Sequence, residues 1–323
     1  MGIRTDLNEE RLDLAEPPPQ GRRNWFVRLL AESHQAQLGL AVLLAFIVMA
    51  LLAPWIVPYD VHTRVGPIYG PPSWSHPVGL DDGGVDVLSL LIVGGRTSLI
   101  VGFAATLVAM VIGGGIGIVS GYFGGKTDGV LMRITDYFIV IPDVPFAIIV
   151  AVVWGPSLEH LIIVIALLLW TTTARIVRAQ VKSVRQRVYV KRARALGASD
   201  LRIVFRHVLP QIGPLLIANT VLTVAVAIFD ETALAFLGLG DPTKITWGSI
   251  IEFAFLRTAI SSGAWWAVIP AGLCVALVIM ACFWLGQSIE DALNPRLKVS
   301  HLSPRVFRIR PSALAGAEDE AAP

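Results

Sequence analysis

The sequence has few charged side chains for its length. Lys, Arg, Asp and Glu make up 15% of the 323 residues, whereas 54% are hydrophobic and the mean hydropathy is +0.67. An ordinary soluble domain carries about 25% charged residues, so this chain is not one. The net charge of +2 also gives no sign of nucleic-acid binding.

Cysteine is almost absent, which argues against a disulfide scaffold or a cysteine-based metal centre. Cys274 and Cys282 both lie in the last long apolar run, where a thiol behaves as a small apolar group. The six histidines are scattered, and no Ser/His/Asp or Cys/His arrangement offers a plausible catalytic frame. The chain is therefore predicted not to be an enzyme and to need no cofactor or metal.

A phosphate-binding loop is missing, although one segment looks like the end of one. Gly124-Gly125-Lys126-Thr127 would need a glycine at position 120, where the chain has Ser120. We interpret this segment as a tight cytoplasmic turn. If ATP drives this protein, another polypeptide must bind it.

Long apolar runs are the main feature that the sequence does have. A helix that crosses ~30 Å of hydrocarbon needs about 20 residues. Six such spans are predicted, at Leu38–Val57, Ser98–Gly121, Thr135–Trp154, Leu158–Thr173, Ile212–Phe236 and Trp265–Leu285. The predicted fold is an all-α integral membrane protein with six transmembrane helices in the lipid bilayer.

The distribution of cations predicts the orientation of these spans. With both termini in the cytoplasm, 22 of the 26 Lys and Arg residues fall on the cytoplasmic side. The four on the outer side are Arg64, Arg96, Lys244 and Arg257. Because cytoplasmic loops carry the excess of Lys and Arg, this arrangement predicts a multi-pass cell-membrane protein with both termini inside.

The same pattern divides the chain into segments. Residues 1–35 form a predicted mobile cytoplasmic tail, residues 36–297 the membrane domain, and residues 298–323 a second cytoplasmic tail. Within the membrane domain, residues 58–97 are a predicted extracytoplasmic loop and residues 175–211 a predicted cytoplasmic loop.

The second predicted span carries a ridge of small residues. They recur every four positions, at Ala105, Ala109, Gly113, Gly117 and Gly121. Such a face lets two helix backbones approach closely within a membrane. It predicts close contact with another helix, in this chain or in a second subunit.

The cytoplasmic loop has the pattern of two short helices. Tyr189, Ala193 and Leu196 recur at helical spacing, and Gly197 suits the position just after a helix end. Ser199 or Asp200 can cap a second helix, which Pro210 would end or bend. A charged helical hairpin between spans is suited to binding a soluble partner; the alternative is a solvated basic loop beside anionic lipid head groups.

This loop resembles the EAA loop of the permease subunits of ATP-binding-cassette (ABC) importers. Ala193, Gly197, Leu209 and Pro210 match that pattern in spacing, while Lys191, Arg192 and His207 replace its Glu, Ala and Ile. The resemblance implies a coupling helix that binds a cytoplasmic ATPase. The implied coupling residues are Tyr189, Lys191, Arg192, Ala193, Leu196, Gly197, Ala198, Ser199, Asp200, Arg202, Phe205, Arg206, His207, Leu209 and Pro210.

A second resemblance narrows the family. The segment from His76 to Ser89, HPVGLDDGGVDVLS, is similar to the HPLGTDDLGRDVLS signature of the peptide/nickel class of importer permeases. Leu80, Gly83 and Val85 depart from that signature. Further similar segments are 121–125, 231 with 234–240, 247–248, 263–266 and 294–297, so that the resemblance covers about residues 36–297.

The chain thus resembles the C-type permease of a dipeptide, oligopeptide or nickel importer. The family architecture implies a second, different permease, two cytoplasmic ABC ATPases and an extracytoplasmic solute-binding protein. In such a machine the ATPase pair moves the coupling helices, which rock the membrane helices between inward-open and outward-open arrangements. The permease transmits this motion and catalyses nothing itself.

Three acids in predicted spans are candidates for the translocation path. Asp143 lies between two prolines of the third span, and Asp230 and Glu231 lie near the outer end of the fifth. Acids in a membrane usually face a bundle interior or a water-filled cavity. Structural pairing with Arg133 or Arg257, or an interfacial position, is the alternative for each.

Two other functions remain open from the residues alone. An ATP-independent secondary transporter or channel would carry its own ion site and often an inverted repeat, which is not evident here. A scaffolding membrane anchor would not need the small-residue ridge, the outer signature and the hairpin together.

The predicted orientation can be tested with a single cysteine at the hairpin. In a variant that lacks Cys274 and Cys282, Ser199→Cys should resist a membrane-impermeant maleimide in intact cells and react once the membrane is opened, because the cations around it favour the cytoplasm. Labelling in intact cells would contradict the orientation.

Overall fold

The computed structural model describes residues 33–293. Residues 1–32 and 294–323 lie outside this part, and with them most of the predicted N-terminal tail (1–35), the C-terminal tail (298–323) and the similar segment 294–297. The described residues form helices and the loops between them. The helices are α2 (His34–Ile56), α3 (Val87–Phe123), α4 (Gly125–Val140), α5 (Asp143–Trp154), α6 (Leu158–Arg185), α7 (Val188–Ala195), α8 (Asp200–Ile203), α9 (Leu209–Phe236), α10 (Trp247–Leu256) and α11 (Ile269–Leu293).

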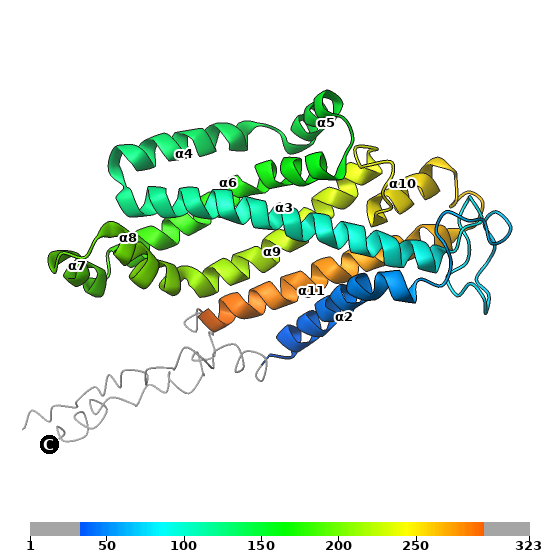
Figure 1. Cartoon of the computed structure of the whole chain (residues 1–323), viewed down its shortest axis with the longest axis horizontal. Coiled ribbons are helices and arrows are strands. Elements are labelled where there is room, and N and C mark those ends of the chain that lie inside the picture. Colours follow the sequence, from blue (N-terminus) through cyan, green and yellow to red (C-terminus); the bar gives the residue numbers. More distant parts are fainter. Residues whose placement is uncertain (1–32, 294–323) are drawn as a thin grey trace, which may run out of the picture.

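The long helices lie side by side along the longest axis of the molecule (Figure 1). The short helices α7 and α8 form one end, whereas α10 and the loop of residues 57–86 form the opposite end. The start of α2 and the end of α11 both point toward the α7 end. The described part of the chain therefore begins and ends on the side of α7, and which side of the membrane this is stays a prediction.

The helices are long and apolar enough for an integral membrane protein. Among the described residues, five helical segments can cross a membrane, and six can if the bent pair α4 and α5 counts as one broken span. The five are α2, α3, α6, the continuous segment Asp200–Phe236, and Trp265–Leu293. The all-α membrane fold predicted from the sequence is confirmed.

The third predicted span is wrong as a single helix. Residues 135–154 fall on α4 and α5, which meet at an angle of 87°. The break lies at Pro142, which has no N–H to donate and forces the extended backbone that Ile141 adopts. Helix α4 also begins earlier than predicted, at Gly125.

Much of the predicted cytoplasmic loop, residues 175–211, continues the long helices, and its place relative to the membrane stays a prediction. Helix α6 continues past Thr173 to Arg185, because cations in this part of the helix pair with acids of α4. Arg175 pairs with Asp136, and Arg178 and Lys182 both pair with Asp128. Long Lys and Arg side chains are also good helix formers.

Pro210 was expected to end or to bend the second helix of the hairpin, and it does not end that helix. A π-helical turn, Val204–Val208, joins α8 to α9, and the chain remains helical through Pro210 to Phe236. The Leu209 N–H bonds to the Val204 carbonyl, five residues back, so the widened turn accommodates the proline.

The predicted extracytoplasmic loop, residues 58–97, is helical from Val87 onward. Helix α3 begins at Val87 rather than Ser98, because Asp86 caps it by accepting a hydrogen bond from the Ser89 N–H. Arg96 interrupts the apolar pattern but lies on an exposed face of this helix. The last predicted span begins with a 3-10 turn, Trp265–Ala267, before α11.

The small-residue ridge packs α3 against α6 within this chain. All five ridge residues are buried, and a Cβ at Gly113 would lie 2.3 Å from the Trp170 carbonyl oxygen. At Gly117 and Gly121 the corresponding distances, to carbonyl oxygens of α6, are 2.7 and 2.8 Å. Real side chains cannot approach a backbone this closely, so these glycines set the separation of the two helices.

The opposite half of the bundle is centred on Trp247, the first residue of α10. Its side chain is fully buried and its Nε1 donates to the Leu91 carbonyl oxygen at 3.0 Å. Its backbone N–H donates to the Ser98 hydroxyl at 3.1 Å. The indole thus anchors α10 to α3 in a core shared with α2, α9 and α11.

Two glycines on α3 provide a matched test of this packing. Gly117→Ala should destabilise the chain by about 1–3 kcal/mol, because the added methyl group overpacks the α3–α6 contact. Gly115 is exposed, and a Cβ added there would meet no other atom within 4 Å. Gly115→Ala should therefore be neutral or slightly stabilising, since alanine favours a helix. Unfolding of the detergent-solubilised chain would measure both, and equal stability of the two variants would contradict the packing.

Candidate functional site

The segment from α7 to α8, residues 188–203, forms a helical hairpin. Helix α7 ends in a Schellman motif: the Ala198 N–H donates to the Ala193 carbonyl at 3.1 Å, and the Gly197 N–H to the Arg194 carbonyl at 3.0 Å. Gly197 has a φ of +81°, which glycine adopts without strain. The glycine therefore sets the sharp reversal between α7 and α8, as its spacing predicted.

The second arm of the hairpin begins at Asp200. Ser199 occupies the N-cap position with extended backbone, although its side chain makes no capping hydrogen bond. The Ile203 N–H donates to the Ser199 carbonyl at 2.9 Å. Helix α8, the π-helical turn and α9 then form one continuous path from the hairpin into the bundle.

Most of the predicted coupling residues lie on the surface of this region. Ala193, Ala198, His207 and Leu209 are half-buried. The exposed ones are Tyr189, Lys191, Arg192, Leu196, Gly197, Ser199, Asp200, Arg202, Phe205, Arg206 and Pro210. The structure thus brings all of them together at one end of the molecule (Figure 1).

Large apolar side chains are exposed among these cations. Leu196 is 88% exposed, Leu201 71% and Phe205 65%. Lipid does not explain them, because charged side chains surround them in sequence and the hairpin projects beyond the long helices (Figure 1). Three large apolar side chains exposed within ten residues of a cation-rich segment favour a protein interaction site. We call Leu196 and Leu201, together with Phe205 in the adjoining π-helical turn, the apolar face of the hairpin.

Tyr122 joins the hairpin to the end of α3. Its buried side chain donates a hydrogen bond from Oη to the Asp200 carboxylate at 2.6 Å. The Arg194 guanidinium lies over its ring, 5.4 Å from the centroid. One side chain of α3 therefore contacts charged groups from both arms of the hairpin.

Asp128 ties together the ends of α3, α4 and α6. Its carboxylate accepts two hydrogen bonds from Arg178, at 2.5 and 2.8 Å, one from Lys182 at 2.6 Å and one from the Ser120 hydroxyl. The acid is mostly buried, so this pairing is screened less by water than a surface ion pair. Asp128 and Tyr122 thus form two separate polar clusters at this end of the bundle, and both include a side chain at the end of α3.

No such role was predicted for Tyr122, Asp128 or Arg194 from the sequence. Tyr122 follows the last glycine of the ridge, which places it beside the close contact with α6. Asp128 lies one turn into α4, near the cations of α6 in space but fifty residues away in sequence. Position next to a packing ridge is a usable signal for Tyr122, whereas the Asp128 pairing requires the fold.

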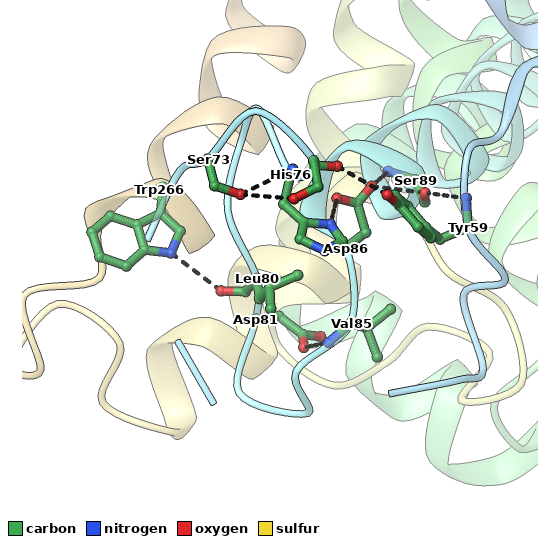
Figure 2. A network of polar contacts seen from close by, with 10 residues as sticks. Tyr59, Ser73, His76, Leu80, Asp81, Val85, Asp86, Ser89 and Trp266 are labelled. Atoms are coloured by element: carbon green, nitrogen blue, oxygen red, sulfur yellow. Dashed lines mark hydrogen bonds and ion pairs between the residues drawn. The ribbon is translucent and has the colours of Figure 1, made fainter. Parts of the chain in front are cut away.

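A separate polar network organises the signature segment at the other end of the molecule (Figure 2). Asp86 accepts hydrogen bonds from the Ser89 N–H and hydroxyl, each at 2.8 Å, and pairs with His76 Nδ1 at 2.9 Å. The Ser89 hydroxyl also accepts from the Tyr59 N–H at 3.2 Å. Asp86 thus fixes both the start of α3 and the fold of the preceding loop.

The middle of the same segment is held by backbone contacts. Asp81 Oδ1 accepts from the N–H groups of Gly83 and Val85, at 2.8 and 2.7 Å. The Trp266 Nε1 donates to the Leu80 carbonyl oxygen at 3.2 Å, which links this loop to the residues just before α11 (Figure 2). The similar positions in the signature therefore serve loop geometry in this structure.

The three acids proposed for a translocation path do not form one cluster. Glu231 is fully buried beside the hydroxyls of Ser98, Thr232 and Thr246, and its Oε1 has no hydrogen-bond partner. Asp230, the preceding residue on α9, is half-buried.

Asp143 is exposed in the first turn of α5 and close enough to Asp230 for the two to repel each other. Arg257, one suggested partner for such acids, pairs instead with Asp82. The buried Glu231 and the Asp143–Asp230 pair thus lie in different surroundings, and a role in translocation stays a prediction for all three.

Two family models match this chain. The model described as "Binding-protein-dependent transport system inner membrane component" matches residues 113–299, more than half of the chain. The model described as "N-terminal TM domain of oligopeptide transport permease C" matches residues 25–72.

Curated proteins of the same kind are similar over most of their length. The di/tripeptide transport system permease of Pseudomonas aeruginosa is 34% identical over 281 residues, which cover 84% of this chain and 92% of that protein. The dipeptide transport system permease of Bacillus subtilis is 35% identical, over 84% of this chain and 85% of that protein. The oligopeptide transport system permease of the same organism is also 35% identical, over 81% of this chain and 86% of that protein. A solved structure of the MetNI methionine ABC transporter in inward-facing conformations has a TM-score of 0.47 to this chain. The two are 18% identical, and the match covers 62% of this chain and 96% of that one.

The contact between Tyr122 and the hairpin can be tested by removing one oxygen atom. Tyr122→Phe keeps the ring and loses the hydrogen bond to Asp200, so amide exchange in residues 188–203 should become about tenfold faster, as expected for one hydrogen bond to a charged group. Tyr137→Phe is the control, because Tyr137 is exposed on α4. Hydrogen–deuterium exchange mass spectrometry measures both, and unchanged exchange in the Tyr122 variant would show that the contact does not hold the hairpin.

Proposed function

This chain belongs to the family of binding-protein-dependent transport system inner membrane components, and we propose that it forms half of the path through which an ATP-driven importer moves peptides across the cell membrane. It is a membrane-spanning permease subunit and not itself a catalyst. The family assignment sets aside the secondary transporter, channel and anchor that the residues alone left open.

The observation that carries the proposed mechanism is the apolar face of the hairpin. Leu196, Leu201 and Phe205 are exposed to water at the end of the molecule where the cations gather. Burying large apolar side chains against a partner is favourable, at about 25 cal/mol for each Å² removed from water. We propose that this face binds a cytoplasmic ATPase subunit and that the surrounding cations set its orientation.

The connections of the hairpin give this contact a mechanical consequence. Tyr122 and Asp128 tie the hairpin and the ends of α3, α4 and α6 together. The α3–α6 contact is too close for the two helices to slide past each other without clashes. A displacement of the hairpin by the ATPase is therefore expected to move α3 and α6 as one body.

The rest of the assembly follows from the family and from the orientation of the chain. The proposed complex contains this subunit, a second and different permease, two ATPase subunits and an extracytoplasmic solute-binding protein. Both chain ends and the hairpin lie in the cytoplasm in this proposal, which agrees with the excess of cations at that end. Peptides are the proposed cargo because similar permeases from Pseudomonas and Bacillus carry that description.

Reconstitution tests the proposed function. Proteoliposomes that contain the chain and its partner subunits should take up a radiolabelled dipeptide only when ATP and the binding protein are present. Leu196→Asp should lower ATPase binding and uptake at least about tenfold, because burying an unpaired carboxylate in an interface is costly.

Trp74→Asp is the matched control, since Trp74 is exposed in the loop at the other end of the molecule. It should leave ATPase binding unchanged. Uptake without ATP would contradict an ATP-driven importer, and normal ATPase binding by the Leu196 variant would contradict the docking role of the hairpin.

A further inference from the structure

A cavity of about 470 Å³ lies at the end of the molecule opposite the hairpin. It is lined by the loop of residues 57–86, the start of α3, residues 242–245 and helix α10. Ligand cavities in proteins commonly have volumes of about 300–1,000 Å³, so this one is large enough for a molecule of the size of a short peptide. Neither the coupling role of the hairpin nor the packing of the bundle uses it.

The cavity combines an apolar wall with opposite charges. Val87, Ile250 and Phe253 contribute apolar side chains, while Asp81 and Lys244 contribute an acid and a base. Asp82 and Arg257 also line it, but they pair with each other. The formal charge left over is one carboxylate and one exposed ammonium group.

Asp81 is the more informative of the two. Its Oδ1 accepts two backbone hydrogen bonds, from Gly83 and Val85, which fix the position of the carboxyl group. None of the ion pairs in the described part of the chain includes Asp81. Burial raises the pKa of this carboxyl above its usual range, although the Val85 and Gly83 N–H groups oppose that rise. The nearby Arg257 also attracts this carboxylate but is already paired with Asp82. A partly desolvated carboxylate in this position gains from an ammonium group that enters the cavity.

We propose that this cavity receives a short zwitterionic peptide, with the ammonium group of the peptide beside Asp81, its carboxylate near Lys244 and its side chains against the apolar wall. The proposal rests on the proposed function, because it assumes that peptides are the cargo. It assigns a cargo site to the signature loop and α10, at the end of the bundle where a binding protein would release its peptide. Asp230 and Glu231 on α9 and Asp143 on α5 do not line this cavity.

Paired changes in ligand and protein test each end group separately. The complete complex in nanodiscs, without the binding protein, should bind Leu-Leu saturably. Asp81→Asn should weaken this binding about tenfold, the order expected for one hydrogen bond between charged groups. The asparagine keeps an Oδ1 that can accept from Gly83 and Val85, so the loop should remain folded.

The modified ligands make the test specific. N-acetyl-Leu-Leu lacks the ammonium group, so its binding should be unaffected by Asp81→Asn. Leu-Leu amide lacks the carboxylate, so its binding should be unaffected by Lys244→Gln. Asp60→Asn is the protein control, because Asp60 accepts a backbone hydrogen bond in the same loop but does not line the cavity.

Three results would overturn the proposal. The first is that the wild-type complex shows no saturable binding of Leu-Leu. The second is that Asp81→Asn weakens the binding of Leu-Leu and of N-acetyl-Leu-Leu equally. The third is that Asp81→Asn abolishes docking of the binding protein while peptide binding is unchanged. The last would assign the cavity to the binding protein. Uptake of labelled Leu-Leu by the full importer distinguishes failure of the cavity site from failure of the proposed function. Uptake without the predicted binding pattern refutes only the cavity site, whereas no uptake of any peptide refutes the proposed function.

Discussion

The close approach of α3 to α6 is the constraint on which the rest of this structure depends. In lipid no hydrophobic force drives two apolar helices together, so their contact depends on van der Waals packing of small residues. Gly113, Gly117 and Gly121 bring the backbones so near that a single methyl group would overlap carbonyl oxygens of α6. This contact ends at Tyr122, and it places Arg178 and Lys182 within reach of Asp128.

The two polar clusters at that end, around Asp128 and Tyr122, convert a packing contact into a mechanical connection. The hairpin has little core of its own, and α7 buries only Val190. Its position relative to the bundle depends on the continuous path through α8 to α9, on Tyr122, and on a buried cluster in which Val190 and Ile203 pack with valines of α6. An ATPase that binds the apolar face therefore acts on α9 through the backbone and on α3 through a side chain. At the other end, Asp86 and Trp247 hold the signature loop and α10 against α3, so the same helix reaches from the hairpin to the proposed peptide cavity.

Local patterns in the sequence predicted much of this arrangement. The apolar runs gave the spans, the four-residue spacing gave the ridge, and Gly197 with Ser199 gave the hairpin turn, because each feature depends on residues close together in the chain. The helix boundaries at Val87 and Arg185 were missed because a hydropathy pattern stops at the first charge, whereas a helix continues where its charges reach partners or water. Hydropathy also joins the residues on both sides of Pro142 into one span, although two prolines surround Asp143. The contacts of Tyr122, Asp128 and Asp81 join distant elements or depend on a loop conformation, and no local pattern contains them.

The central claim is that the hairpin and α3 move together. Spin labels at Ser199→Cys in the hairpin and Val119→Cys on the exposed face of α3, in a complex without the two native cysteines, report their separation by electron–electron double resonance. If the two elements move together, the distance distribution is the same in nucleotide-free and ATP-trapped complexes. The labelled complex should also still transport when it is free to cycle. A shift of several ångströms between those states would show that the hairpin moves independently of α3, and would contradict the account.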